Sequence, residues 1–280
     1  MPKVVCALVL VLLVAAVCVD VAQPRSAQVR VERALWSPAV KGRLRLRIYL
    51  PSRYASSRQR YPVVYFLHGL PAASTSFRGA DFLDRALEAS GRRAIIVAPQ
   101  GARDDDSDPE YLDWGRGRNW ETAITRDIVG YVDANFRTIP RRRGRAIVGL
   151  SAGGYGAVIL ALHHLSAFSV VESWSGYFHP TDPQGLRALD LGSTRANENA
   201  SAHAFVKTLH RAFDRRPTYF AFYVGRRDER FRDENERFDR ELSAAHVPHV
   251  FRVYAGGHEQ SVWTSHARAW LALAVDHLGR

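Results

Sequence analysis

Hydrophobic residues in this chain fall into two alternating patterns, short continuous runs and longer segments with helical spacing. Continuous apolar runs are typical of strands that are buried on both faces of a parallel sheet. Apolar residues that recur every three or four positions are typical of amphipathic helices. The expected strands are 62–67, 94–98, 146–150, 170–173, 218–224 and 250–254, and the expected helices are 81–89, 121–136, 155–165, 199–213, 234–245 and 262–278. This alternation predicts an α/β fold with a mainly parallel central sheet and helices on both faces.

Two segments before the first continuous run have a different pattern. Residues 29–35 and 44–50 alternate between polar and apolar, which predicts an N-terminal antiparallel pair of strands. Residues 102–118 are rich in glycine and aspartate and predict a polar loop. No long insertion follows the expected strand at 170–173, so we expect no large lid. Without internal repeats or low-complexity linkers, the sequence predicts one domain over residues 28–280.

The N-terminal segment has the pattern of an export signal. Residues 4–19 are almost wholly apolar, which is short for a membrane span of about 20 residues but suits a secretion signal over residues 1–22. A lipoprotein anchored at Cys18 and an uncleaved anchor are the alternatives. Because both cysteines, Cys6 and Cys18, lie in this segment, the mature domain would contain no disulfide and no cysteine nucleophile. We expect a secreted or cell-envelope protein.

Charge narrows the range of partners. The formal net charge is +11, and nearly all the cations are arginines scattered along the chain. The densest cluster, 141–145, precedes an expected strand and is typical of a solvated turn. Since the cations do not repeat along one face, we expect no nucleic-acid binding. From the charge we expect peripheral contact with an anionic cell envelope instead.

The segment 149–153, Gly-Leu-Ser-Ala-Gly, joins the expected strand at 146–150 to the expected helix at 155–165. This strand–turn–helix context is that of a nucleophile elbow, in which the serine hydroxyl is exposed on a strained turn. The turn is so tight that the residues two positions before and after the serine must be small, and both are glycine here. Ser151 is therefore the predicted nucleophile, which needs a neighbouring base to take its proton.

A base and an acid follow the last two expected strands. His258 lies in a Gly-Gly-His loop after the last strand, and Asp228 lies just after the preceding one. Sites in parallel sheets lie beyond the carboxyl ends of the strands, so these side chains and Ser151 should meet there. Glu229 and Asp233 are the alternatives for the acid. The order serine, acid, histidine along the chain is that of α/β-hydrolases.

An oxyanion hole is the third requirement of this chemistry. Each N–H group aimed at the developing oxyanion contributes about 3–4 kcal/mol of transition-state stabilisation. The backbone N–H of Ala152 and that of Leu70, after a bend at Gly69, are the expected donors. We expect His68 to shape this loop rather than to exchange protons.

The remaining histidines show no ligand spacing such as H-E-x-x-H, so the sequence predicts no metal site and no cofactor. Several aromatic residues fall on segments near the expected active edge, where they could line a pocket for an acyl or phenolic group. Core packing is the alternative for each of them. The candidates are Trp114, Trp120, Trp174, Tyr177 and Trp263, with Phe77 and Phe178 beside them.

Four segments together resemble the esterase D group of α/β-hydrolases, which includes tributyrin and feruloyl esterases, S-formylglutathione hydrolases and the antigen 85 mycolyltransferases. The segments are 149–157 around Ser151, His68-Gly69-Leu70, Trp120-Glu121-Thr122 and Gly257-His258. The resemblance spans about residues 28–278. It implies a triad of Ser151, Asp228 and His258, with Leu70 and Ala152 as oxyanion donors.

The resemblance implies a secreted serine carboxylic-ester hydrolase that acts through an acyl-enzyme on small acyl or aromatic esters. Segment 149–157 is most similar to small-ester esterases, whereas Trp120-Glu121-Thr122 and the export signal are more similar to the mycolyltransferases. Gly153-Gly154 and the missing cysteine pair depart from the mycolyltransferases. An acyltransferase that moves the acyl group to a sugar hydroxyl and a non-catalytic envelope-binding protein are the alternatives.

Overall fold

The computed structural model of the chain describes residues 29–70, 72–101, 109–182 and 187–279. The expected export signal at 1–22, with both cysteines, and the aspartate-rich part of the loop at 102–108 lie outside the described residues. Among the helices of the described residues, none combines the length and the apolar character that crossing a bilayer requires.

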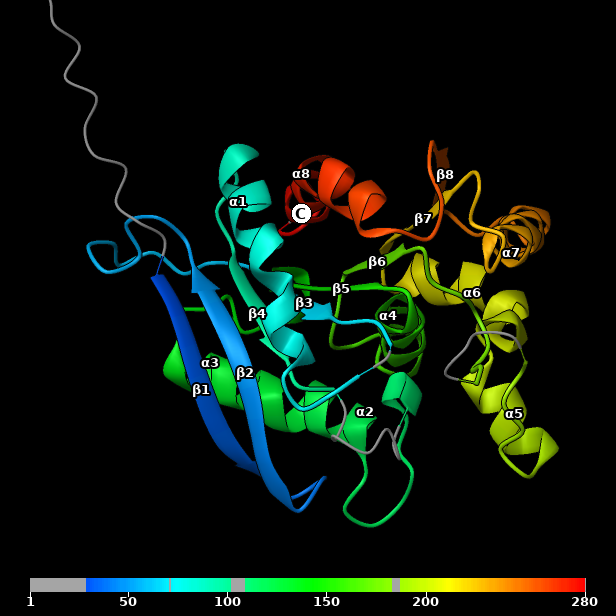
Figure 1. Cartoon of the computed structure of the whole chain (residues 1–280), viewed down its shortest axis with the longest axis horizontal. Helices are drawn as coiled ribbons and strands as arrows, with labels where there is room; N and C mark the ends of the chain where they lie inside the picture. Colours follow the sequence, from blue (N-terminus) through cyan, green and yellow to red (C-terminus); the bar gives the residue numbers. More distant parts are fainter. Residues whose placement is uncertain (1–28, 71, 102–108, 183–186, 280) are drawn as a thin grey trace, which may run out of the picture.

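A single eight-stranded sheet runs through the molecule (Figure 1). Its spatial order is β1-β2-β4-β3-β5-β6-β7-β8. The strands are β1 (Val29–Ser37), β2 (Gly42–Leu50), β3 (Val63–Leu67), β4 (Ile95–Pro99), β5 (Arg145–Leu150), β6 (Val170–Trp174), β7 (Tyr219–Gly225) and β8 (Val250–Tyr254). β1 and β2 pair antiparallel with each other and with β4, and all the other pairs are parallel. The predicted N-terminal pair and the mainly parallel sheet are therefore confirmed.

Helices cover both faces of the sheet, as the sequence predicts. They are η1 (Ser76–Ala80), α1 (Asp81–Ala89), η2 (Pro109–Tyr111), α2 (Trp120–Thr122), η3 (Ala123–Ile128), α3 (Val129–Asn135), η4 (Arg142–Gly144), α4 (Ala152–His163), α5 (Thr194–Ala200), α6 (Ala202–Arg215), α7 (Arg232–Ala244) and α8 (Gln260–Asp276). α1 and α8 lie together on one face, over their own hydrophobic core (Figure 1). The other core, beneath the second face, includes buried residues of α3, α4, α6 and α7.

Two of the predicted helices differ in detail from the helices in the structure. The helix expected at 121–136 is continuous from Trp120 to Asn135, but its middle, η3, has the wider π-helical turn. The helix expected at 199–213 is wrong at its start, because Ser201 has an extended backbone and separates α5 from α6. Tertiary hydrogen bonds account for the break. The Tyr155 hydroxyl donates to the Ala200 carbonyl at 2.7 Å, and the amide of Ala202 donates to Phe178 at 2.7 Å.

The register of the parallel strands brings four chain segments to one edge. Leu67 at the end of β3 pairs with Gly149 of β5, and Leu150 pairs with Trp174 of β6. Gly225 at the end of β7 pairs with Tyr254 at the end of β8. Because parallel strands end at the same edge, the loops after β3, β5, β7 and β8 lie along it. In the described residues, α5 is the only helix in the connection from β6 to α6, so the prediction of no large lid is confirmed.

A carboxylate with two histidine partners ties α2 to the end of α4. Glu121 lies 2.9 Å from Nδ1 of His163 and 2.7 Å from Nε2 of His164. Nε2 of His163 faces the carbonyl of Asn199 at 2.8 Å, so both ring nitrogens of His163 face acceptors. Burial opposes charge on both groups, but their mutual hydrogen bonds outweigh it. The pKa of Glu121 therefore falls to about 2, and the pKa of His163 is raised.

Glu121→Gln should lower the free energy of unfolding by about 2 kcal/mol at pH 6, because it weakens charge-assisted hydrogen bonds to two histidines. The pKa of Glu121 is about 2 in the folded protein and about 4.3 in an unfolded chain. The carboxylate therefore stabilises the fold above about pH 4, and this contribution is lost as the pH falls toward 2.

Urea unfolding of the wild type and the variant between pH 6 and pH 2 checks this prediction. The difference in unfolding free energy should shrink on the acid side. Glu198→Gln, at an exposed position of α5, is the matched control and should change stability by less than about 0.5 kcal/mol. Equal stability of Glu121→Gln and the wild type at pH 6 would refute the stabilising role of the cluster.

Candidate active site

The turn between β5 and α4 holds Ser151 in a strained conformation. Its φ is 53° and its ψ is −123°, outside the usual regions for a residue with a side chain. The turn is closed by backbone contacts that leave no room for a Cβ atom. A Cβ on Gly149 would lie 2.0 Å from the Gly153 carbonyl oxygen, and one on Gly153 would lie 2.1 Å from the Leu67 oxygen. Both glycines are therefore required by space, as the sequence predicts for an elbow.

Ser151 also caps the buried helix α4. Its carbonyl accepts hydrogen bonds from the amides of Gly154 at 2.8 Å and Tyr155 at 3.1 Å, while its own amide donates to Trp174 of β6. Ala152 is the first residue of α4. The N-terminal amides of a helix have no partner within the helix, and they carry the positive end of its dipole. The serine hydroxyl therefore lies beside a region that favours negative charge.

Asp228 is held in one orientation by backbone donors. It is 1% exposed, and its Oδ1 accepts hydrogen bonds from the amides of Arg230 at 3.3 Å and Phe231 at 3.2 Å. Its Oδ2 faces Nδ1 of His258 at 2.8 Å. The two alternatives for the acid are turned to solvent. Glu229 is exposed, and the Asp233 side chain is 94% exposed.

His258 lies within hydrogen-bonding distance of both the acid and the serine. While Nδ1 faces Asp228, Nε2 lies 3.0 Å from Oγ of Ser151. The rings of Phe231 and Trp263 each pack nearly perpendicular to the imidazole, with centroid distances of 5.1 and 5.2 Å. Because Asp228 accepts only from an Nδ1–H, Nε2 is left with a lone pair directed at the serine hydroxyl. This is the tautomer that a general base requires.

Close approach of two loops sets the position of the histidine. The amide of Arg226 donates to the Tyr254 carbonyl at 2.7 Å, and that of Arg227 donates to the Gly256 carbonyl at 2.8 Å. A Cβ on Gly225 would lie 2.6 Å from the Gly257 oxygen, so the loops after β7 and β8 touch backbone to backbone. The loop that carries the acid and the loop that carries the base are therefore one rigid unit.

The loop after β3 passes beside the serine. A Cβ on Gly69 would lie 3.0 Å from Cβ of Ser151, so Gly69, the residue before Leu70, lies against the serine. His68 is buried, its Nε2 accepts a hydrogen bond from the amide of Gly101, and its carbonyl accepts one from the Tyr111 hydroxyl at 2.6 Å. These contacts give His68 the shaping role that we expected from the sequence.

The aromatic candidates for a substrate pocket fall into two groups in the structure, those enclosed in the cores and those near the triad or a surface hollow. Trp120 and Trp174, with Phe77 and Phe178 beside them, have almost no exposed surface and pack in the two cores. The pocket interpretation is wrong for these four, because their side chains are enclosed in the cores and have no surface to offer a substrate. Tyr177, which is 2% exposed, is enclosed in the same way. Trp263 contacts the His258 ring and donates to the Ser175 hydroxyl at 3.0 Å. Trp114 is half-buried and lines a hollow with Glu121 and His163.

Tyr177 rests on a buried carboxyl group that the sequence did not reveal. Its hydroxyl lies 2.7 Å from Oε1 of Glu110, and Thr181 donates to the same oxygen. Burial raises the pKa of Glu110 to about 8. Glu110 belongs to the segment 102–118, for which the sequence predicted a polar loop and gave no sign of a buried carboxyl group. Phe231, against the His258 ring, was also missed, since an aromatic residue shortly after the acid has no distinct sequence signal.

One group of potential metal ligands lies on other elements. His179, in the connection after β6, His203 on α6 and Glu234 on α7 bring their ligand atoms within 4.8 Å of one another. No two of them share a helix or a strand, so no sequence spacing could have revealed them. The Ser151 arrangement itself can carry out nucleophilic catalysis with side chains alone, since it contains a nucleophile, a base and an acid.

Comparison with known proteins identifies the family of this chain. The family model of the Esterase family matches residues 37–269. Esterase Rv1288 of Mycobacterium tuberculosis is 34% identical over 141 residues, a match that covers 50% of this chain and 29% of that protein. Diacylglycerol acyltransferase/mycolyltransferase Ag85A of Mycobacterium leprae is 33% identical over 140 residues, covering 46% of this chain and 40% of that protein. The matches thus span less than half of these curated relatives.

Solved structures extend the similarity over the whole domain. A ferulic acid esterase has a TM-score of 0.74 and 26% identity, covering 91% of this chain and all of its own. The S-formylglutathione hydrolase of Staphylococcus aureus has a TM-score of 0.74 at 20% identity, covering 89% of this chain and all of its own, and shows the shared fold. The chain has the α/β-hydrolase fold and belongs to the Esterase family.

Proposed function

We propose that this protein is a secreted serine carboxylic-ester hydrolase that works through an acyl-enzyme. The observation that carries the proposal is the unbroken series of hydrogen bonds from Ser151 Oγ through His258 to Asp228. Membership of the Esterase family supports the reaction class. The apolar segment at 4–19 supports export.

In the proposed reaction Ser151 Oγ attacks the ester carbonyl while Nε2 of His258 takes the hydroxyl proton. Asp228 holds the ring and stabilises the imidazolium that forms. The imidazolium then gives its proton to the leaving alcohol, and the acyl group remains on Oγ as an ester. Water attacks this ester with His258 again as the base, which releases the acid and restores the serine.

The negative charge that develops on the carbonyl oxygen must be stabilised by hydrogen-bond donors other than the triad side chains. The amide of Ala152, at the start of α4, and the amide of Leu70, in the loop that touches Ser151, are the donors that we propose. The dipole of α4 adds to the same effect, since its positive end faces this region.

Esters of small or aromatic acids are the proposed substrates. The rings of Trp263 and Phe231 both contact the His258 ring, so the surroundings of the base are aromatic. A solved structure that is 26% identical to this chain is a ferulic acid esterase, which supports an aromatic acyl group.

Acyl transfer to a sugar hydroxyl is the second candidate. It shares the acyl-enzyme and differs only in the acceptor of the second step. The observation in its favour is the 33% identity with mycolyltransferase Ag85A over 140 residues. The distinction lies in the products, since hydrolysis yields a free acid and transfer yields a new ester.

Ser151→Ala should lower kcat for p-nitrophenyl butyrate by about 10⁴-fold or more, because the covalent step is lost. Steady-state kinetics on the purified protein measure this effect. Ser243→Ala makes the same change at an exposed position of α7 and should leave kcat within about twofold of the wild type. Turnover by Ser151→Ala at the wild-type rate would refute the nucleophile assignment.

Asp228→Asn should lower kcat by about 10³–10⁴-fold while the fold is retained, because the amide no longer fixes the His258 tautomer or stabilises its cation. Glu229→Gln is the matched control one residue away. Its side chain is exposed, and we expect near wild-type turnover. A larger loss of kcat in Glu229→Gln than in Asp228→Asn would reassign the acid.

Incubation of the enzyme with an ester donor and trehalose or glycerol distinguishes the two candidate reactions. We expect free acid as the main product, since the domain shares its whole length with a ferulic acid esterase. Mass spectrometry of the products makes the measurement. Acylated sugar or glycerol as the main product would favour the transferase.

A further inference from the structure

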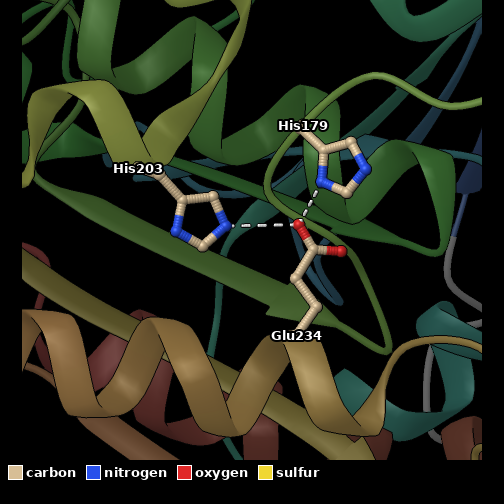
Figure 2. Close-up of side chains that lie close together, drawn as sticks. All are labelled: His179, His203 and Glu234. Atoms are coloured by element: carbon tan, nitrogen blue, oxygen red, sulfur yellow. Dashed lines mark hydrogen bonds and ion pairs between the residues drawn. The ribbon is translucent and has the colours of Figure 1, made fainter. Parts of the chain in front are cut away.

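Three side chains from separate elements lie close together on the face of the sheet that α6 and α7 cover. Figure 2 shows His179 and His203 with a ring nitrogen directed at the carboxylate of Glu234. His179 follows β6, His203 lies in the first turn of α6, and Glu234 lies in the first turn of α7. A cation bound among them would therefore join three segments of the chain.

The potential ligand atoms of the three side chains lie close enough together to bind one cation. Oε1 of Glu234 lies 2.5 Å from Nδ1 of His179 and 3.3 Å from Nε2 of His203, and it also accepts from the amide of Phe178 at 2.9 Å. All three ligand atoms fall within 4.8 Å of one another. Four-coordinate zinc, with bonds of about 2.0–2.2 Å, separates its ligand atoms by about 3.3 Å. The His203 contact already has this length, whereas the hydrogen bond between His179 and Glu234 must lengthen by about 0.8 Å when an ion enters.

Glu241 orients the ring of His203. Its Oε2 lies 2.5 Å from Nδ1 of His203, so the Nδ1 proton points at a carboxylate. Nε2 of the same ring faces the Glu234 carboxylate, which is an acceptor. Either a proton on Nε2 or a metal cation must therefore lie between these two atoms. A carboxylate behind a histidine is also the usual outer partner of a metal-binding imidazole.

The cluster is sheltered but reachable from solvent. The side chains of His203 and Glu234 are 14% and 15% exposed, and His179 is 36% exposed. All three line a surface hollow of about 500 Å³, together with Ser201, Asp233 and Arg237. The guanidinium of Arg237 is paired with Glu241 at 2.8 Å, which offsets its repulsion of a cation. The hollow leaves space for water as a further ligand.

We propose that His179, His203 and Glu234 form a binding site for one divalent transition-metal ion of the zinc class. Two imidazole nitrogens and one carboxylate oxygen are a donor set that suits zinc, and water from the hollow completes four-coordination. The ion takes the place of the protons that lie between the rings and Glu234. This inference reverses the expectation of no metal site, which rested on sequence spacing alone.

The position of the site gives the ion a structural role. It fixes the connection after β6 to α6 and α7, where Asn235 already donates to the Gly176 carbonyl at 2.8 Å. The same start of α7 follows Phe231, which packs against the ring of His258. Metal binding at this site is independent of the esterase chemistry, so the two proposals can fail separately.

Calorimetric titration with Zn²⁺ tests the proposal directly. The protein is the full chain without a polyhistidine tag, with Cys6→Ser and Cys18→Ser to remove thiolate ligands, treated first with a chelator. We expect one ion per chain, a rise in Tm on binding and, with Co²⁺ in place of Zn²⁺, visible absorption bands of a four-coordinate site. His179→Ala and Glu234→Gln should each weaken binding by more than about 100-fold, and Glu241→Gln by about 10–100-fold.

His210→Ala is the matched control, because it removes an exposed imidazole from the same helix, α6, near Asp214. It should bind Zn²⁺ as the wild type does. His179 is partly exposed, so its loss should leave the fold intact, and circular dichroism of the variant verifies this. Absence of a one-to-one Zn²⁺ complex in the wild type would overturn the proposal. So would equal Zn²⁺ affinity in the wild type and His179→Ala.

Discussion

Backbone-to-backbone packing around Ser151 is the constraint on which the rest of this structure depends. The start of α4 rests against the end of β3 so closely that the Gly153 position has no room for a side chain. This packing holds Ser151 at a positive φ, with its hydroxyl 3.0 Å from Nε2 of His258. The strain is sustained because α4 is buried along almost its whole length, and the burial of its apolar residues outweighs a cost of about 1–3 kcal/mol.

The acid and the base depend on a second close contact. Gly225 and Gly257 touch across the ends of β7 and β8, and backbone hydrogen bonds clamp the two loops. Asp228 is consequently removed from water, and its charge is balanced by amides on one oxygen and by the imidazole on the other. Hydrogen bonds in such a sheltered site are stronger than in water, and they are already in place before a substrate binds.

The strands and the position of the elbow could be predicted from the sequence. Their signals, continuous apolar runs and small residues at fixed spacing, are contained within a few neighbouring positions. The break at Ser201 was missed, since hydrogen bonds from Tyr155 and Ala202 to distant segments create it. Trp174 was misplaced because the side of the sheet to which an indole turns depends on the packing of both cores. The ligand cluster around Glu234 joins three elements, so no periodicity encodes it.

Labelling with a fluorophosphonate probe, followed by peptide mass spectrometry, tests the central claim most directly. The reagent bonds covalently only to a serine that a neighbouring base activates, so it reports the geometry and the reactivity together. The account predicts one adduct per chain, on the peptide that contains Ser151. An adduct on a different serine, or no adduct in a preparation that still hydrolyses esters, would contradict it.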